Sequence, residues 1–250
     1  MIRTLFLLLL SVQLFAIVAI KPREVGEKPG LSGELTGAFE TKRGNTEKDN
    51  YAGSLQLQFD SNTSYVVWGV LRGEYGEASG VRDTNNLFAH LRYIRNITGP
   101  DIAAEGFAQM ERDEFKSIEE RALVGGGVRW KVLNKKRGQW GGLFIGAGAY
   151  AEYIGYSTAV DPLERNLRFN SYLAYSLPLP DKGLFTAVGY YQPKCDDFDD
   201  YYVTASARVE LQIYRQLYLG FSVEYAHDSK PAVAIKQDDF SQRTLFTFKF

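Results

Sequence analysis

The last seven residues, Thr244-Leu-Phe-Thr-Phe-Lys-Phe250, decide the fold that the sequence predicts. Successive side chains of an extended strand point to opposite faces, so Phe246, Phe248 and Phe250 share one face and Lys249 lies on the other. Chain ends of soluble proteins are usually polar and frayed, and a row of exposed phenylalanines does not fit that pattern. The row does fit a strand that closes a bacterial outer-membrane barrel and faces lipid, which is therefore the structure predicted for this stretch.

Alternation of apolar and polar residues recurs upstream of this stretch, and clusters of Asp, Asn, Gly and Ser separate the alternating runs. The pattern predicts an all-β fold, a single antiparallel transmembrane β-barrel of about twelve strands that occupies residues 20–250. An even number of strands places both chain ends on one side of the membrane. In residues 184–192 both faces are apolar, so the pattern does not assign their directions. The expected strands are residues 31–40, 50–59, 65–75, 87–93, 102–111, 121–132, 143–153, 166–175, 184–192, 201–213, 217–225 and 244–250.

Aromatic residues on the apolar faces gather at the two ends of the expected strands, with Leu, Val, Ala and Gly between them. Two aromatic rings that flank an aliphatic band are typical of the places where a barrel meets the two membrane interfaces. A soluble sandwich would instead bury its aromatics in strand centres. The expected outer ring contains Tyr51, Tyr75, Tyr153, Tyr201 and Tyr225, and the inner ring contains Phe59, Tyr65, Tyr93, Trp130, Tyr175 and Phe250.

Residues 1–19 differ in composition from the rest of the chain. Arg3 precedes apolar runs at residues 5–10 and 14–19, and Ala19 is a small residue at which cleavage could occur, as in a secretory signal peptide. An uncleaved membrane anchor is the alternative, although Ser11 and Gln13 interrupt a run that is short for a span. The chain has a single cysteine, Cys195, which excludes an intrachain disulfide.

The polar faces of the strands would line the lumen of such a barrel. Charges of both signs are interspersed on these faces, so they either form ion pairs that fill the lumen or line a narrow path that selects solutes. Both alternatives stay open, because a twelve-stranded barrel lies between small filled barrels and open porins. The candidate lumen-lining residues are Arg72, Glu74, His90, Arg92, Glu105, Glu111, Arg121, Arg129, Arg208, Glu210, Glu224 and Arg243.

An outer-membrane hydrolase is the alternative from another functional class. Such an enzyme needs a nucleophile next to a base, and the chain has only two histidines, His90 and His227, with no serine in a nucleophile-elbow pattern. We therefore expect no catalytic residue and no enzyme activity. The acidic run of residues 195–200 lacks the ligand spacing of a calcium loop, so neither a metal nor a cofactor is expected.

Several short motifs resemble those of a known family. Gly33 with the turn at residues 41–46, then Phe107-Ala108-Gln109, Glu120-Arg121 and Gly125-Gly126-Gly127, are similar to segments of the salt-induced outer membrane protein family. The resemblance implies an outer-membrane barrel without an assigned substrate, and it carries over no catalytic residue.

We therefore expect a non-enzymatic protein of the bacterial outer membrane, with a narrow channel for small hydrophilic solutes or ions as the leading function. A purely structural or adhesive barrel is a further alternative. The expected partners are outer-membrane lipids and the barrel-assembly machinery, which would bind the C-terminal strand ending in Phe250. The near-balanced charge, 29 basic and 30 acidic residues, gives no reason to expect nucleic acid.

Overall fold

The computed structural model describes residues 23–42, 47–133, 141–180 and 182–250. The predicted signal peptide at residues 1–19 and the predicted turn at residues 43–46 lie outside the described residues. No helix in the described part of the chain is long and apolar enough to cross a membrane.

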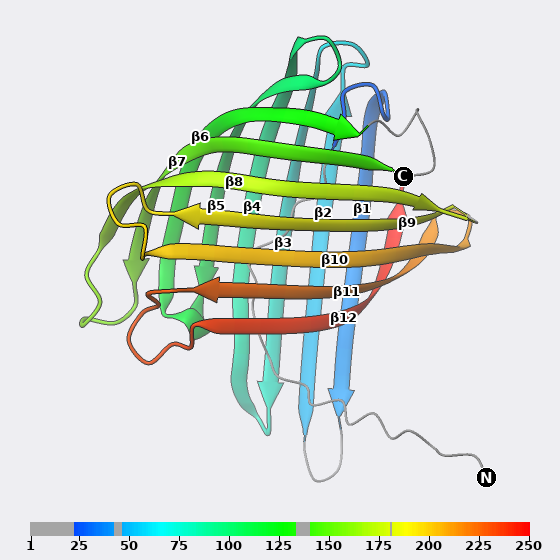
Figure 1. The fold of residues 1–250 in the computed structure, drawn as a ribbon. Helices are drawn as coiled ribbons and strands as arrows, with labels where there is room; N and C mark the ends of the chain where they lie inside the picture. The colour runs from blue at the N-terminus through cyan, green and yellow to red at the C-terminus, as the bar shows by residue number, and fades with distance from the viewer. Residues whose placement is uncertain (1–22, 43–46, 134–140, 181) are drawn as a thin grey trace, which may run out of the picture.

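Twelve strands form one closed antiparallel barrel in which each strand pairs with its neighbours in sequence and β1 pairs with β12 (Figure 1). The prediction of a twelve-stranded antiparallel barrel is confirmed. We call the end at which β1 begins and β12 ends the inner end, and the opposite end the outer end. The strands are β1 (Gly30–Lys42), β2 (Lys48–Asp60), β3 (Tyr65–Ala78), β4 (Val81–Thr98), β5 (Ile102–Asp113), β6 (Ile118–Leu133), β7 (Gly142–Tyr156), β8 (Glu164–Leu179), β9 (Gly183–Pro193), β10 (Tyr201–Tyr214), β11 (Leu217–Asp228) and β12 (Asp238–Lys249).

Two strands are notably longer than the alternation predicts. β4 begins at Val81 and β12 at Asp238, each six residues before its predicted start. The added residues are mostly polar, which hides them from a pattern search, but pairing with β3 and β11 fixes them as strand. The structure also assigns the faces of β9, where Val188 and Tyr190 are buried inside and Tyr191 is exposed outside.

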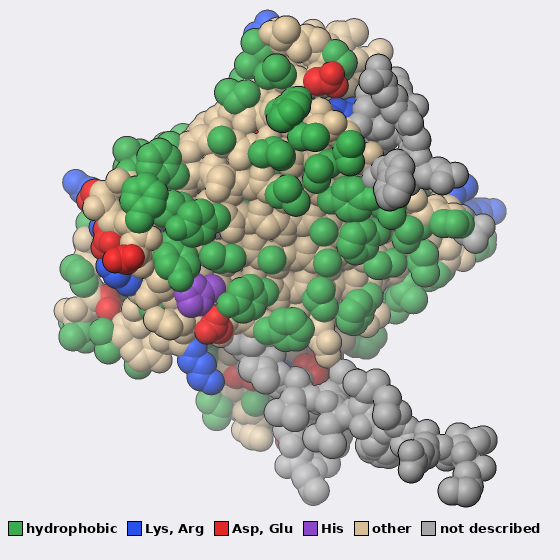
Figure 2. All heavy atoms as spheres, viewed as in Figure 1, with side chains coloured by type: hydrophobic (Ala, Val, Ile, Leu, Met, Phe, Trp, Pro, Cys, Tyr) green, Lys and Arg blue, Asp and Glu red, His purple; other side chains and the backbone are tan. Residues whose placement is uncertain are grey.

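The outward faces of the strands are apolar and exposed, whereas many inward side chains are polar or charged and buried. Leu31 and Phe39 on β1 expose 75% and 72% of their surface, while Glu34 between them exposes 8%. Hydrophobic side chains cover much of the wall seen in Figure 2. A soluble protein would not leave such a belt in water, and lipid is the solvent that matches it.

The barrel closes through a short seam at its inner end. Gly33 and Phe250 exchange two backbone hydrogen bonds, of 2.8 and 3.0 Å, and pairing continues from Glu34 with Lys249 to Gly37 with Phe246. Toward the outer end β1 and β12 diverge (Figure 1). The C-terminal residue therefore contributes both an apolar ring and the backbone groups that close the sheet.

Glycines let β6 and β7 approach each other closely. Gly127 and Gly148 are partners in the ladder, and a methyl group on Gly148 would lie 2.1 Å from the carbonyl oxygen of Gly126 and 2.6 Å from the Cα of Gly127. Since both obstacles are backbone atoms, a side chain there requires the strands to separate. On β6, Gly125 leaves room for the inward side chains of Phe107 and Tyr150.

We predict that Gly148→Ala lowers the free energy of unfolding by about 1–3 kcal/mol because it overpacks this contact. Urea titration of the protein folded into lipid vesicles measures the change. Gly106→Ala is the matched control, because a methyl group there has no atom within 4 Å. Equal stability of the two variants would contradict the close approach.

Candidate functional site

The candidate site is the interior of the barrel, where the structure brings all of the sequence-predicted residues except His90 together in three networks. Arg72, Glu111, Arg208 and Arg243 are partly buried. That the twelve candidate residues line a solute path stays a prediction, because their burial does not show that a solute passes through the barrel. The other eight candidates, Glu74, His90, Arg92, Glu105, Arg121, Arg129, Glu210 and Glu224, are buried.

The outer network joins β5 to β10 near the outer end. Arg121 on β6 pairs with Glu152 on β7 at 2.6 Å and with Glu111 on β5 at 3.3 Å. Arg168 on β8 reaches the other oxygen of Glu152 at 2.9 Å and Asp200 at 2.8 Å. Both guanidinium groups also lie over the ring of Tyr202, at 4.9 and 4.0 Å. The charges are nearly dry and depend on one another for compensation.

The middle network has one carboxylate for two arginines. Glu105 on β5 lies 3.5 Å from Arg92 and 3.4 Å from Arg129, and it accepts a 2.7 Å hydrogen bond from the hydroxyl of Tyr172. The Arg92 guanidinium carbon lies 5.2 Å from the centre of the Phe107 ring, a cation–π contact that compensates part of the charge. Further rings within 6 Å of Arg92 belong to Trp68 and Tyr172.

The third network lies beside the seam and connects strands that are not neighbours. Arg72 on β3 pairs with Glu224 on β11 at 3.4 Å, and Arg243 on β12 pairs with Glu74 on β3 at 3.0 Å. These contacts therefore connect β3 directly to β11 and β12, although β2 and β1 lie between them in the barrel wall. Glu210, the fifth member, binds both Arg208 and Lys249. The pairs therefore hold together the part of the wall in which the β1–β12 ladder is short.

Residues 23–28 occupy the inner mouth. Arg23 is 9% exposed and pairs with Glu34 at 3.3 Å, and Glu24 pairs with Lys131. The carboxylate of Asp60 accepts hydrogen bonds from the backbone N–H groups of Gly26 and Lys28. This segment narrows the inner mouth and ties it to three strands, β1, β2 and β6.

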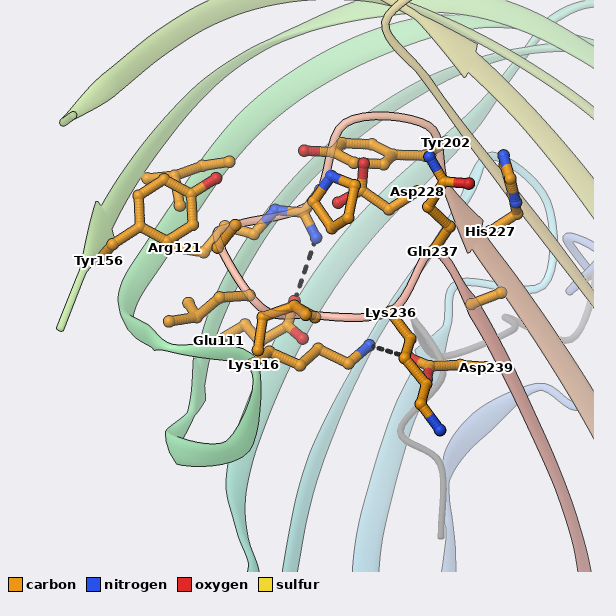
Figure 3. Close-up of a pocket in the computed structure, with 16 residues that line it drawn as sticks. Glu111, Lys116, Arg121, Tyr156, Tyr202, His227, Asp228, Lys236, Gln237 and Asp239 are labelled. Atoms are coloured by element: carbon orange, nitrogen blue, oxygen red, sulfur yellow. Dashed lines mark hydrogen bonds and ion pairs between the residues drawn. The ribbon is translucent and has the colours of Figure 1, made fainter. Parts of the chain in front are cut away.

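The connection between β11 and β12 bends over the outer mouth, where it covers a cavity of about 50 Å³ (Figure 3). Lys116 and Asp239 form a 2.9 Å ion pair there, and Arg121 points toward Glu111 from the barrel wall. The N–H of Val233 donates to Asp161 in the β7–β8 connection. Loop-to-loop contacts thus hold the outer mouth partly closed.

The acidic connection at residues 194–200 also takes part in these outer contacts. Lys230 of the β11–β12 connection donates a hydrogen bond to Asp197, which lowers the pKa of that carboxyl. Asp200 turns inward to Arg168. No group of three or more His, Cys, Asp or Glu residues suited to a metal occurs in the part of the chain that the structure describes.

Sequence reasoning missed the aromatic content of the interior. Besides the lipid-facing rings, a second set of aromatic side chains points inward and is almost completely buried. His90 lies within this set, 5.1 Å from the ring of Trp68, with its Nδ1 3.3 Å from Gln109. The parity of each strand, once fixed, would have assigned these rings to the lumen. They are Trp68, Phe88, Phe107, Phe144, Tyr150, Tyr172, Tyr190 and Tyr202.

The two halves of the lumen differ in packing. Every inward side chain of β8 from Asn166 to Ser176 is buried, whereas inward side chains on β1 and β2, such as Thr36, Ala38 and Ser54, keep partial exposure. The arginines follow the same division, whereas the carboxylates Glu74, Glu210 and Glu224 are buried on the seam side as well. Side chains of Arg121, Arg129 and Arg168 expose 5%, 6% and 1% of their surface. Those of Arg72 and Arg208 each expose 19%.

Comparison with known proteins gives one family match and several solved barrels of similar fold. Residues 36–250 match the family model described as "Protein of unknown function, DUF481". The translocator domain of the autotransporter NalP from Neisseria meningitidis is similar with a TM-score of 0.50 and 14% identity, over 90% of each chain. The NanC porin gives a TM-score of 0.48 and 10% identity over 87% of this chain and 97% of the porin. No curated protein matches the sequence.

We predict that Glu152→Gln lowers the free energy of unfolding by about 3–5 kcal/mol, because Arg121 and Arg168 would lose their shared buried counter-charge. Urea titration in lipid vesicles measures the loss. Asp197→Asn, which removes the same charge from the exposed pair with Lys230, serves as the control and should leave stability unchanged. Similar values for both variants would argue against a structural role of the outer network.

Proposed function

Since the chain belongs to the family described as "Protein of unknown function, DUF481" and forms a barrel of the bacterial outer membrane, we propose that it is a non-enzymatic envelope protein with a narrow path for small hydrophilic solutes or ions. The observation that carries the proposal is the division of the lumen into a packed half and a half that keeps contact with water. The path runs along the inward faces of β1 and β2 and past the third network.

The lining of this path suits ions and small polar solutes. Thr36, Ala38 and Ser54 present small side chains, so the wall of β1 and β2 leaves space that longer side chains would fill. Four cationic groups face three carboxylates in the third network, which leaves one positive charge in excess. Such a lining favours anions weakly, because a local excess of charge selects the opposite sign. The cationic groups are Arg72, Arg208, Arg243 and Lys249, and the carboxylates are Glu74, Glu210 and Glu224.

A purely structural barrel is the second candidate, and the packed half of the lumen supports it. Side chains of β4 to β9 fill that half with rings and ion pairs, as in small barrels that conduct nothing. The charged seam-side half argues for a path. Apolar packing could provide the stability that ion pairs contribute there, so stability alone does not explain the charged side chains. We do not propose the hydrolase, since His90 is surrounded by Trp68, Phe88, Phe107 and Gln109 and none of these is a nucleophile.

Export and assembly complete the proposal. A cleaved signal peptide at residues 1–19 would deliver the chain to the periplasm. The barrel-assembly machinery would then bind β12 and the residue that follows it, Phe250, which pairs with Gly33 when the barrel closes.

We predict that the purified protein in a planar bilayer shows discrete conductance steps with a weak preference for anions. Arg72→Gln and Arg243→Gln should each move the reversal potential toward cation preference, because each removes a positive charge from the path. Arg82→Gln is the control, since this arginine pairs with Glu114 at the exposed outer rim. A silent bilayer would contradict the path and favour the structural barrel.

A further inference from the structure

We infer that a small cavity in the packed half of the lumen is a binding site for a monovalent anion of the size of chloride or bromide. The cavity, of about 30 Å³, lies between the outer and middle networks, and Arg92 and Arg121 both line it. This site goes beyond the proposed path, which runs along the opposite wall.

The charge of the lining selects an anion. Both charged residues that line the cavity are arginines, and no carboxylate lines it. Glu105 serves two arginines, so the middle network keeps one positive charge in excess next to the cavity, whereas the outer network has three carboxylates for two arginines. The carboxylates that pair with Arg121, those of Glu111 and Glu152, lie outside the lining.

Unpaired hydrogen-bond donors in the lining give the second reason. Among the described residues, neither the Nε of Arg92 nor the hydroxyl of Tyr150 finds a hydrogen-bond acceptor, and the two residues are only 5% and 2% exposed. Burying a donor without a partner costs free energy, so each of these donors favours a bound hydrogen-bond acceptor in the cavity. An anion between the two groups would accept a hydrogen bond from both.

His90 provides a hydrogen-bond acceptor for a water molecule that lies beside the anion in the cavity. Its Nδ1 lies 3.3 Å from the amide oxygen of Gln109, an acceptor, so Nδ1 carries the proton and Nε2 has a free lone pair. That Nε2 also has no hydrogen-bond partner within the described part of the chain. It suits a water molecule, which donates to Nε2 and binds the anion with its second hydrogen.

The size of the cavity limits the ligand. A water-sized particle needs about 10–15 Å³ of such volume, so 30 Å³ holds an anion and one water molecule but no sugar or peptide. Arg121 lines this cavity and also the cavity under the β11–β12 connection.

Anomalous diffraction from crystals of the protein soaked in bromide tests the site directly. We expect a bromide peak in the cavity, next to Arg92 Nε and the Tyr150 hydroxyl, and we expect added chloride to weaken it. Tyr150→Phe keeps the ring and removes one donor, so the bromide concentration for half occupancy should rise about fivefold. Tyr156→Phe is the matched control, because Tyr156 lines only the outer cavity and its hydroxyl binds Glu164.

A wild-type crystal without a peak in the cavity at near-molar bromide would overturn the inference. So would equal occupancy in the wild type and in Tyr150→Phe. Because the measurement reads bound bromide and not current, a silent bilayer would overturn the proposed path and leave this site standing. Conversely, a conducting barrel with an empty cavity would overturn the site alone.

Discussion

Every backbone N–H and C=O group in the hydrocarbon region must find a partner within the protein, and the architecture of this chain follows from that constraint. Water is absent there, so an open sheet edge would cost several kcal/mol for each unpaired group. Twelve strands answer the constraint by pairing in sequence order, and Phe250 completes the ring through its two hydrogen bonds with Gly33. Alternation then separates the two faces of each strand, so that apolar side chains form the lipid-facing belt while the polar side chains point into the lumen.

The polar interior raises a second problem, the burial of many charges in a narrow lumen. The structure compensates them by sharing, since Glu152 serves two arginines and Glu105 serves two more. Aromatic rings supply the remaining compensation, most closely where Arg168 lies 4.0 Å from the centre of the Tyr202 ring. On the seam side, ion pairs between β3 and the strands β11 and β12 span the short ladder, and their arginines, Arg72 and Arg243, keep partial exposure. Stability and solvent access are thus divided between opposite walls.

Much of the fold could be predicted from the sequence, because period-two alternation reports directly which face of a strand meets lipid. The last strand shows this well, with Phe246, Phe248 and Phe250 all exposed. Alternation failed at the start of β4, where Arg82, Asp83 and Thr84 carry no apolar signal and only the partner strand fixes them. Alternation also could not show which inward side chains pair with one another across the lumen. Contacts such as Arg72 with Glu224 join residues that are 152 positions apart, and nothing in either local sequence specifies the other.

The most direct test of the account compares two tryptophans of the chain in vesicles that contain brominated lipid. Trp130 lies on the outward face of β6 and is 54% exposed, whereas Trp68 lies on the inward face of β3 and is 3% exposed. Two variants, each retaining one of these tryptophans with phenylalanine at the other two positions, isolate the signals. The account predicts strong quenching of Trp130 and little of Trp68. Equal quenching, or stronger quenching of Trp68, would contradict a barrel whose apolar face meets the bilayer.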